Sequence, residues 1–256
     1  MSQTDSTTRF LDRAGYYASH RPRYPAEVID LLLEEAGWTP EATVVDVGSG
    51  TGISSELFLE RGNTVIAVEP NPDMRRAAER RLGANLKFRS IDGKAEATTL
   101  RSTCADFVVC ATAFHWFDVE ACRHEFRRIL KPQRVVVLMW NKRRSETSPV
   151  LEAYETLLRQ YGKDYESRWR KQSANLEESV RRFFEPALFQ KRSFDNSQRL
   201  DFDGLRGRFL SSSYTPLPGE PLYEPAIREL ESLFERFAVA GAVTLEYDTQ
   251  IYWGRF

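Results

Sequence analysis

The chain has 256 residues, 41% of them hydrophobic, and a formal net charge of −1. This length allows one large α/β domain, or one domain with a subdomain. The near-neutral charge does not indicate an obligate nucleic-acid partner, and no apolar run approaches the ~18 residues of a membrane span. The three histidines are scattered and the three cysteines lack metal-ligand spacing, so we expect no metal site. A polar first segment, unlike a secretory signal, favours a reducing, cytoplasmic protein without disulfides.

Helices and strands are predicted to alternate through the first 141 residues. Apolar patterns and their stop signals predict helices over 26–36, 54–61, 71–82 and 120–130. Short β-branched runs predict strands over 43–47, 64–68, 86–91, 105–111 and 134–140. This alternation is typical of a doubly wound parallel sheet with right-handed crossovers.

The regular alternation ends after residue 141. We predict a Rossmann-like core with an N-terminal cover segment over 1–141, and a terminal edge strand over 241–256. Between them, residues 142–240 are expected to form an inserted helical lid that shapes the substrate site and contains one strand near 189–194. The last two strands would pair antiparallel, which gives an α/β, mostly parallel seven-stranded sheet with an antiparallel edge.

The most informative motif is a glycine-rich turn after the first predicted strand. Residues 44–52 read Val-Val-Asp-Val-Gly-Ser-Gly-Thr-Gly, and the next strand ends at Glu69. Glycines let the backbone bend tightly and lie against a ligand, because no side chain intervenes. An acid at the tip of the following strand is placed to bind a ribose diol. The two features predict an adenosine-containing cofactor at the carboxyl edge of the sheet.

The spacing of the glycines argues against a dinucleotide or a phosphate loop. A G-x-G-x-x-G fingerprint needs glycine where this chain has Ile53, and no Gly-Lys-Ser/Thr follows. Asp46, just before the glycines, would repel a pyrophosphate but suit a cationic amino-acid moiety. The motif therefore resembles the first motif of class I S-adenosyl-L-methionine (SAM)-dependent methyltransferases; a glycine turn without a ligand is the alternative.

Further motifs resemble a small-molecule methyltransferase group (methyltransferase type 11 domain) that includes relatives of trans-aconitate methyltransferase. They are Tyr17-Ala-Ser-His-Arg-Pro-Arg-Tyr-Pro25, Gly93-Lys-Ala-Glu96, Ala113-Phe-His-Trp-Phe-Asp118, Leu130-Lys-Pro132 and Trp140-Asn141. They cover most of residues 16–141, and the later match is looser. Gln133-Arg134 replaces the group's usual Gly-Gly, so we expect the turn before the fifth strand to be built differently.

The resemblance implies SAM as cofactor and S-adenosyl-L-homocysteine (SAH) as product. The glycine turn would line the methionyl part, Asp46 would meet its ammonium, and Glu69 would accept both ribose hydroxyls. Each of three residues also has a structural alternative. Asp46 could cap its own loop, Met74 could be a core residue, and Glu96 could be a surface residue. The predicted cofactor-binding residues are Asp46, Gly48, Ser49, Gly50, Thr51, Gly52, Glu69, Pro70, Met74, Ala95, Glu96, Thr112 and Ala113.

The resemblance also implies an acceptor site beside the loop after the fourth strand. The predicted substrate-binding residues are Tyr17, Arg21, Phe114, His115, Trp116, Trp140, Asn141 and Tyr214. His115 is the candidate catalytic base, although plain packing is the alternative for it and for Tyr17 and Arg21. A carboxylate acceptor would need no base, and an arginine clamp would then matter more than His115.

We therefore predict a SAM-dependent methyltransferase that methylates a small organic acceptor on oxygen, with a carboxylate as one possibility. A nucleic-acid methyltransferase is an alternative, because Lys142-Arg-Arg144 and Arg168-Trp-Arg-Lys171 are basic; solvated helix faces explain them more simply. A catalytically silent SAM-binding protein and, more distantly, a dehydrogenase are further alternatives. No membrane partner is expected, and the sequence indicates neither an oligomeric state nor the identity of the acceptor.

Overall fold

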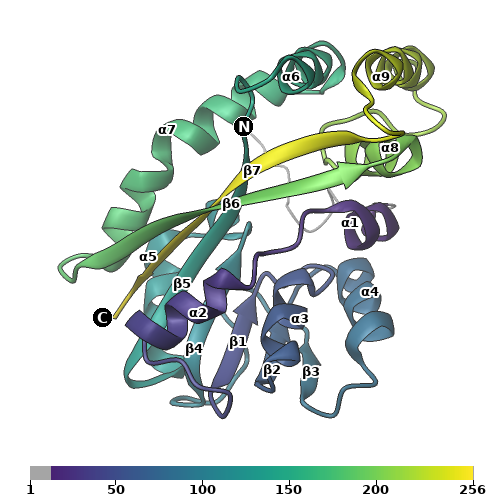
Figure 1. Cartoon of the computed structure of the whole chain (residues 1–256). Helices are drawn as coiled ribbons and strands as arrows, with labels where there is room; N and C mark the ends of the chain where they lie inside the picture. Colours follow the sequence, from purple (N-terminus) through teal and green to yellow (C-terminus); the bar gives the residue numbers. More distant parts are fainter. Residues whose placement is uncertain (1–12, 256) are drawn as a thin grey trace.

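The computed structural model describes residues 13–255, without the side chains of residues 133, 134 and 167–175. A seven-stranded sheet in the order β3-β2-β1-β4-β5-β7-β6 runs through it (Figure 1). Strands β1 to β5 are parallel, and β7 runs antiparallel to both β5 and β6. The predicted doubly wound, mostly parallel sheet with an antiparallel edge is confirmed. The strands are β1 (Thr43–Val47), β2 (Thr64–Val68), β3 (Phe88–Ile91), β4 (Ala105–Ala111), β5 (Leu130–Arg143), β6 (Phe189–Leu200) and β7 (Val243–Gly254).

The helices begin where local capping signals place them. Asn71 Oδ1 accepts hydrogen bonds from the backbone N–H groups of Asp73 (2.9 Å) and Met74 (3.2 Å), and Pro72 opens the helix. Asp118 caps the helix after β4 in the same way. The helices are α1 (Ala14–His20), α2 (Glu27–Glu35), α3 (Ile53–Glu60), α4 (Pro72–Leu82), η1 (a 3₁₀ turn, Phe114–Trp116), α5 (Val119–Ile129), α6 (Pro149–Tyr161), α7 (Tyr165–Phe184), α8 (Phe202–Leu210) and α9 (Tyr223–Phe237).

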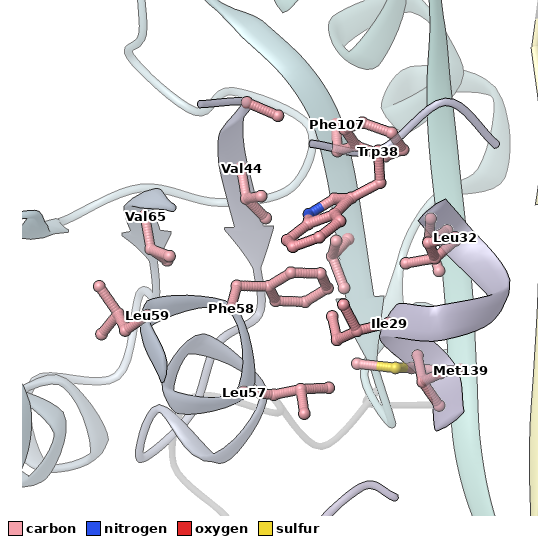
Figure 2. Close-up of a cluster of buried hydrophobic side chains, with 14 of the residues drawn as sticks. Ile29, Leu32, Trp38, Val44, Leu57, Phe58, Leu59, Val65, Phe107 and Met139 are labelled. Atoms are coloured by element: carbon pink, nitrogen blue, oxygen red, sulfur yellow. The ribbon is translucent and has the colours of Figure 1, made fainter. Parts of the chain in front are cut away.

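The central strands are buried on both faces, which explains why they are continuous apolar runs. Successive side chains of a strand point to opposite faces, so Val44 packs in one core and Val45 in the other. Figure 2 shows the first core, in which Ile29 of α2 and Phe58 of α3 lie against the sheet. Helices α5 and α7 cover the second core.

A third hydrophobic cluster joins helices α6, α8 and α9 to β7. Figure 1 shows these helices gathered over the far ends of the long strands β6 and β7, beyond the five parallel strands. Helix α1, which the sequence did not predict, packs against both α8 and α4. The N-terminal segment therefore bridges these helices and the parallel sheet. The division of the chain at residues 141 and 240 stays a prediction.

The predicted strand boundaries were wrong in β3, in β6 and at both ends of β5, which ends at Arg143 rather than 140. Strand β3 begins at Phe88 rather than 86, because residues 85–88 form a turn in which the Phe88 N–H donates to the Asn85 carbonyl. Strand β6 continues to Leu200 because it pairs with β7 along its whole length. Strand β5 begins at Leu130 rather than 134. Its pairing passes from Ala105–Leu130 to Phe107–Val135, so residues 131–134 bulge opposite a single residue of β4 where a turn was expected.

Candidate functional site

A cavity opens at the carboxyl edge of the parallel strands, where β1, β2 and β4 end. Its walls come from the glycine turn, the segments after β2 and β4, the N-terminal segment and α8. Open α/β sheets bind their ligands at this edge. The predicted site residues that line the cavity are Tyr17, Arg21, Gly48, Ser49, Gly50, Glu69, Pro70, Met74, Thr112, Ala113, Trp116 and Asn141.

The glycine turn after β1 is packed so tightly that a side chain would not fit. Gly48 has φ +68°, and a Cβ added there would lie 2.6 Å from Cβ of Ala113. Gly52 has φ +80°, and its added Cβ would lie 2.6 Å from Leu82 Cδ1. Both positions therefore require glycine for conformation and for space. The turn presents bare backbone to the cavity at Gly48 and Gly50.

Glu69 holds the rim of the cavity at the end of β2. Its side chain is 9% exposed; Oε2 accepts the Gly50 N–H and Oε1 accepts the Asn71 N–H, both at 2.9 Å. Burial raises the pKa of Glu69, and these two backbone hydrogen bonds oppose the rise. Each oxygen keeps a further lone pair for a ligand hydroxyl. A ribose diol is the chemistry that this carboxylate suits.

Asp46 lies behind the glycine turn and is 0% exposed. Its Oδ2 accepts the Ser54 and Ser55 hydroxyls at 2.7 Å, which ties the end of β1 to the first turn of α3. Its Oδ1 is buried and has no hydrogen-bond partner among the residues described. Burial raises the pKa of Asp46 to about 6. The Ser49 and Thr51 hydroxyls are also buried without partners there, so this corner can take a polar, cationic ligand group.

The segment after β4 forms the opposite wall. Thr112 has φ +55°, a strained conformation for a β-branched residue and one that concentrates at functional sites. Its hydroxyl lies 2.8 Å from the Tyr24 hydroxyl, which anchors the N-terminal segment to the wall. Trp116 and Phe117 complete this side. The half-buried His115 packs on Trp116 with ring centroids 4.9 Å apart and does not line the cavity.

Several predicted site residues lie away from the cavity wall. Phe114 packs on Phe183 (ring centroids 5.0 Å apart), and the Tyr214 ring lies 4.8 Å from that of Tyr165. Glu96 accepts the backbone N–H of Asp118 at 3.0 Å. The predicted residues outside the lining are Asp46, Thr51, Gly52, Ala95, Glu96, Phe114, His115, Trp140 and Tyr214.

The cavity also contains residues that sequence reasoning missed. Tyr24 and Phe117 lie inside motifs already singled out, and Asn71 follows Glu69 closely, so position alone could have flagged them. Arg208 of α8 carried no signal, because only folding brings it to this edge. The missed lining residues are Pro22, Tyr24, Ile53, Ser54, Asn71, Ala111, Phe117 and Arg208.

The N-terminal segment is tied down across the cavity. The Asn141 side-chain amide donates to the carbonyls of Pro22 and Arg23, both at 3.2 Å. The Arg13 guanidinium donates to the carbonyls of Leu210 (2.8 Å) and Ser212 (2.6 Å). These contacts hold a cover over the site between α8 and the sheet, which favours exclusion of water from a bound ligand.

The described residues include no group of three or more His, Cys, Asp or Glu side chains that could hold a metal ion. A search of the same part of the chain finds no helix with the length and apolar character needed to cross a membrane.

The part of the chain that holds the glycine turn and Glu69 is similar to known proteins. Residues 45–138 match the family model described as a methyltransferase domain. A methyltransferase-like protein of Schizosaccharomyces pombe, itself uncharacterized, is 32% identical over 166 residues, which are 63% of this chain and 62% of that protein. An uncharacterized methyltransferase of Mycobacterium tuberculosis is 34% identical over 156 residues, 61% of each chain. The matches thus span less than two thirds of these relatives.

A solved structure from Anaeromyxobacter dehalogenans, named as a type II methyltransferase, has the same fold. It superposes with a TM-score of 0.67 at 22% identity and covers 92% of this chain and 97% of that one. The family match supports SAM as the cofactor. The residues fit it, because the cavity combines a bare glycine turn, a carboxylate at the rim and an unpaired buried carboxylate oxygen behind.

Proposed function

We propose that the chain is a SAM-dependent methyltransferase that methylates an oxygen of a small organic acid. The observation that carries the proposal is that the bare turn Gly48–Gly50 and the Glu69 carboxylate line one cavity, with the unpaired buried oxygen of Asp46 behind the turn. These residues lie inside the segment that matches a methyltransferase domain. Glu69 would bind the ribose hydroxyls, and Asp46 would attract the ammonium group. Met74 and Pro70 would flank the adenine as apolar walls.

When bound, SAM supplies a methyl group on a positively charged sulfur, whose bond electrons leave with the sulfur as SAH. The chain's own residues would align and enclose the reactants, which is the main requirement for a displacement with a good leaving group. Thr112 and Trp116 line the side from which an acceptor oxygen would approach. Tyr17 and Arg21 in the tied-down N-terminal segment would exclude water there.

A carboxylate is the acceptor group that the wall favours. Burial lowers the pKa of His115 to about 4, and its side chain lies outside the cavity lining, so it is poorly placed to take a proton from the acceptor. A carboxylate is already ionised at neutral pH and needs no base. Arg21 and Arg208 line the same cavity, and their positive charge suits an acceptor that is an anion as a whole. The motif resemblance to relatives of trans-aconitate methyltransferase also supports a small-molecule acceptor.

A nucleic-acid substrate is the weaker candidate. Arg143 is buried and paired with Glu155 at 2.6 Å, and Arg144 is paired with Asp248 at 2.7 Å and with Asp195. These arginines are already neutralised and would not attract phosphates. The second basic cluster, at residues 168–171, has side chains outside the described part of the structure.

The first test of the proposal is calorimetric titration with SAM, SAH and NAD, followed by mass spectrometry of organic acids incubated with SAM. We expect SAM and SAH to bind, NAD not to bind, and a mass increase of one methyl group on at least one acid. Binding of NAD in place of SAM would refute the proposal. SAM binding without transfer to any acid would instead favour a catalytically silent binding protein.

A further inference from the structure

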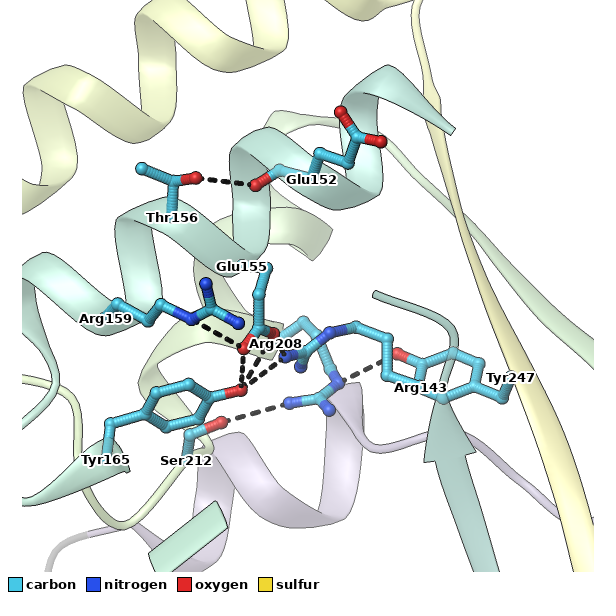
Figure 3. A network of polar contacts seen from close by, with 9 residues as sticks. All are labelled: Arg143, Glu152, Glu155, Thr156, Arg159, Tyr165, Arg208, Ser212 and Tyr247. Carbon is cyan, nitrogen blue, oxygen red and sulfur yellow. Dashed lines mark hydrogen bonds and ion pairs between the residues drawn. The ribbon is translucent and has the colours of Figure 1, made fainter. Parts of the chain in front are cut away.

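Arg208 of α8 is a buried cation that faces the cavity. Its side chain is 4% exposed and lines the cavity wall. Nε donates to the Tyr247 hydroxyl at 3.1 Å, and Nη1 donates to the hydroxyls of Ser212 (3.1 Å) and Ser211 (3.4 Å). Figure 3 shows the guanidinium held by Tyr247 and Ser212. These partners are neutral, so they orient the charge without neutralising it.

Arg21 brings a second guanidinium to the same place. Its Nη2 donates to the Ser211 carbonyl at 2.8 Å, and its guanidinium carbon lies 4.7 Å from the centre of the Tyr17 ring. Its Nε is buried and has no partner among the residues described. Arg21 and Arg208 thus bind the carbonyl and the hydroxyl of one residue, Ser211, and both line the cavity. Burial and the neighbouring Arg208 charge lower the pKa of Arg21.

Glu155, the acid drawn beside Arg208 in Figure 3, already forms an ion pair with another arginine. Glu155 pairs with Arg143 at 2.6 Å and accepts the Tyr165 hydroxyl at 2.8 Å (Figure 3). Within residues 13–255, no carboxylate forms an ion pair or hydrogen bond with Arg21 or Arg208. Arg208 is buried and Arg21 is half-buried, and two positive charges that line one cavity in this way are costly unless an anion joins them. The arrangement therefore points to an anionic ligand.

We propose that Arg21 and Arg208 form a two-arginine clamp for an acidic group of the acceptor that is not the oxygen receiving the methyl group. The planar guanidinium fork matches a carboxylate or a phosphate. An oxygen held by two guanidiniums has its lone pairs engaged and its charge dispersed, so it is a poor nucleophile. The acceptor therefore carries an anionic anchor and a separate reacting oxygen. This inference rests on the proposed function, because only a methyltransferase would bind the anion as part of a methyl acceptor.

The clamp predicts selective anion binding that can be measured without knowing the acceptor. Succinate, neutral succinamide and inorganic phosphate are titrated into the protein by calorimetry at constant ionic strength, with and without saturating SAH. We expect succinate or phosphate to bind and succinamide not to bind. The stronger of the two anions identifies a carboxylate or a phosphate anchor. Failure of both anions to bind the wild-type protein would overturn the clamp.

Variants then locate the anion. Arg208→Met should weaken binding of the preferred anion at least tenfold, a loss typical of hydrogen bonds to a charged group. Arg208→Lys, which keeps the charge but loses the fork, should recover only part of it. Arg192→Met removes an exposed arginine on β6 that pairs with Glu35, and it should bind like the wild type. Thermal unfolding verifies that each variant is folded. If Arg208→Met is unfolded, the test uses Arg208→Lys, for which we expect a smaller loss of anion affinity.

One result would reassign the clamp to the cofactor. If Arg208→Met weakens SAH binding as much as anion binding, the guanidinium holds the cofactor's own carboxylate and the inference is wrong. Unchanged anion affinity in both Arg208 variants would also overturn it. Failure of the proposed function is distinguishable, because SAH would then not bind the wild-type protein, whereas the anion titration without SAH still tests the clamp.

Discussion

Glu69→Gln is the sharpest perturbation of the cavity rim, because it removes a charge while keeping the shape. In the wild type, both carboxylate oxygens accept backbone N–H groups, from Gly50 and Asn71, at 2.9 Å. A glutamine amide would turn its NH2 group toward one of these donors or toward a ligand hydroxyl. One charged hydrogen bond would be lost, worth about 1.5–3 kcal/mol. We therefore expect SAH affinity to fall roughly 10- to 150-fold.

The assay is calorimetric titration with SAH at pH 7.5, together with thermal unfolding of the unliganded protein. Glu79→Gln is the matched control, because Glu79 is exposed on α4 and undergoes the same change of charge. We expect the control to bind SAH like the wild type. If Glu69→Gln remains folded and binds SAH with unchanged affinity, then Glu69 does not touch the cofactor, and the reasoning about the rim is refuted.

Three other perturbations test the site and the fold. Asp46 has a pKa raised to about 6, so its contribution to stability is present below about pH 4 and lost as the pH rises through 6. The ammonium group of SAH needs the ionised form of Asp46, so SAH affinity should fall about tenfold from pH 7 to pH 5. Calorimetry should find this slope absent in Asp46→Asn; a persisting slope would contradict the contact. Gly48→Ala should destabilise the protein and abolish SAH binding. The control Gly62→Ala, at φ +91° with open space around it, should destabilise the protein without changing SAH binding. If the two variants bind SAH with equal affinity, the turn does not face the cofactor. A hydrogen bond from Arg128 lowers the pKa of Glu125 to about 2, so this stabilisation is present above about pH 4.5 and lost as the pH falls toward 2. Glu125→Gln should cost about 2 kcal/mol in urea unfolding at pH 7 and only about a quarter of that, roughly 0.5 kcal/mol, at pH 2.5. A cost independent of pH would refute the pair.

The parts of the fold that the sequence predicted are those set by local signals. The glycine turn was predictable because its three glycines, all with positive φ, directly follow a β-branched run in the sequence. Helix α4 begins as expected because Asn71 caps it and Pro72 opens it, and it ends at Leu82, before Gly83. The edge of the sheet was harder, because the length of β6 is set by its pairing with β7 rather than by its own pattern.

The acceptor side of the site was only partly predictable, because its walls come from distant segments. Phe114 and Trp140 lie beside cavity residues in sequence, yet their rings pack inward against Phe183 and Tyr252. An aromatic run does not reveal which of its members faces a cavity. Arg208 is the opposite case, since it is remote in sequence and reaches the cavity only because α8 packs against α1.

A crystal structure of the protein with SAH tests the central claim most directly. We predict that the nucleoside lies over Gly48–Gly52, with both ribose hydroxyls within hydrogen-bonding distance of the Glu69 carboxylate and the ammonium group facing Asp46. Electron density for SAH at any other place, or an empty cavity at millimolar SAH, would contradict the account.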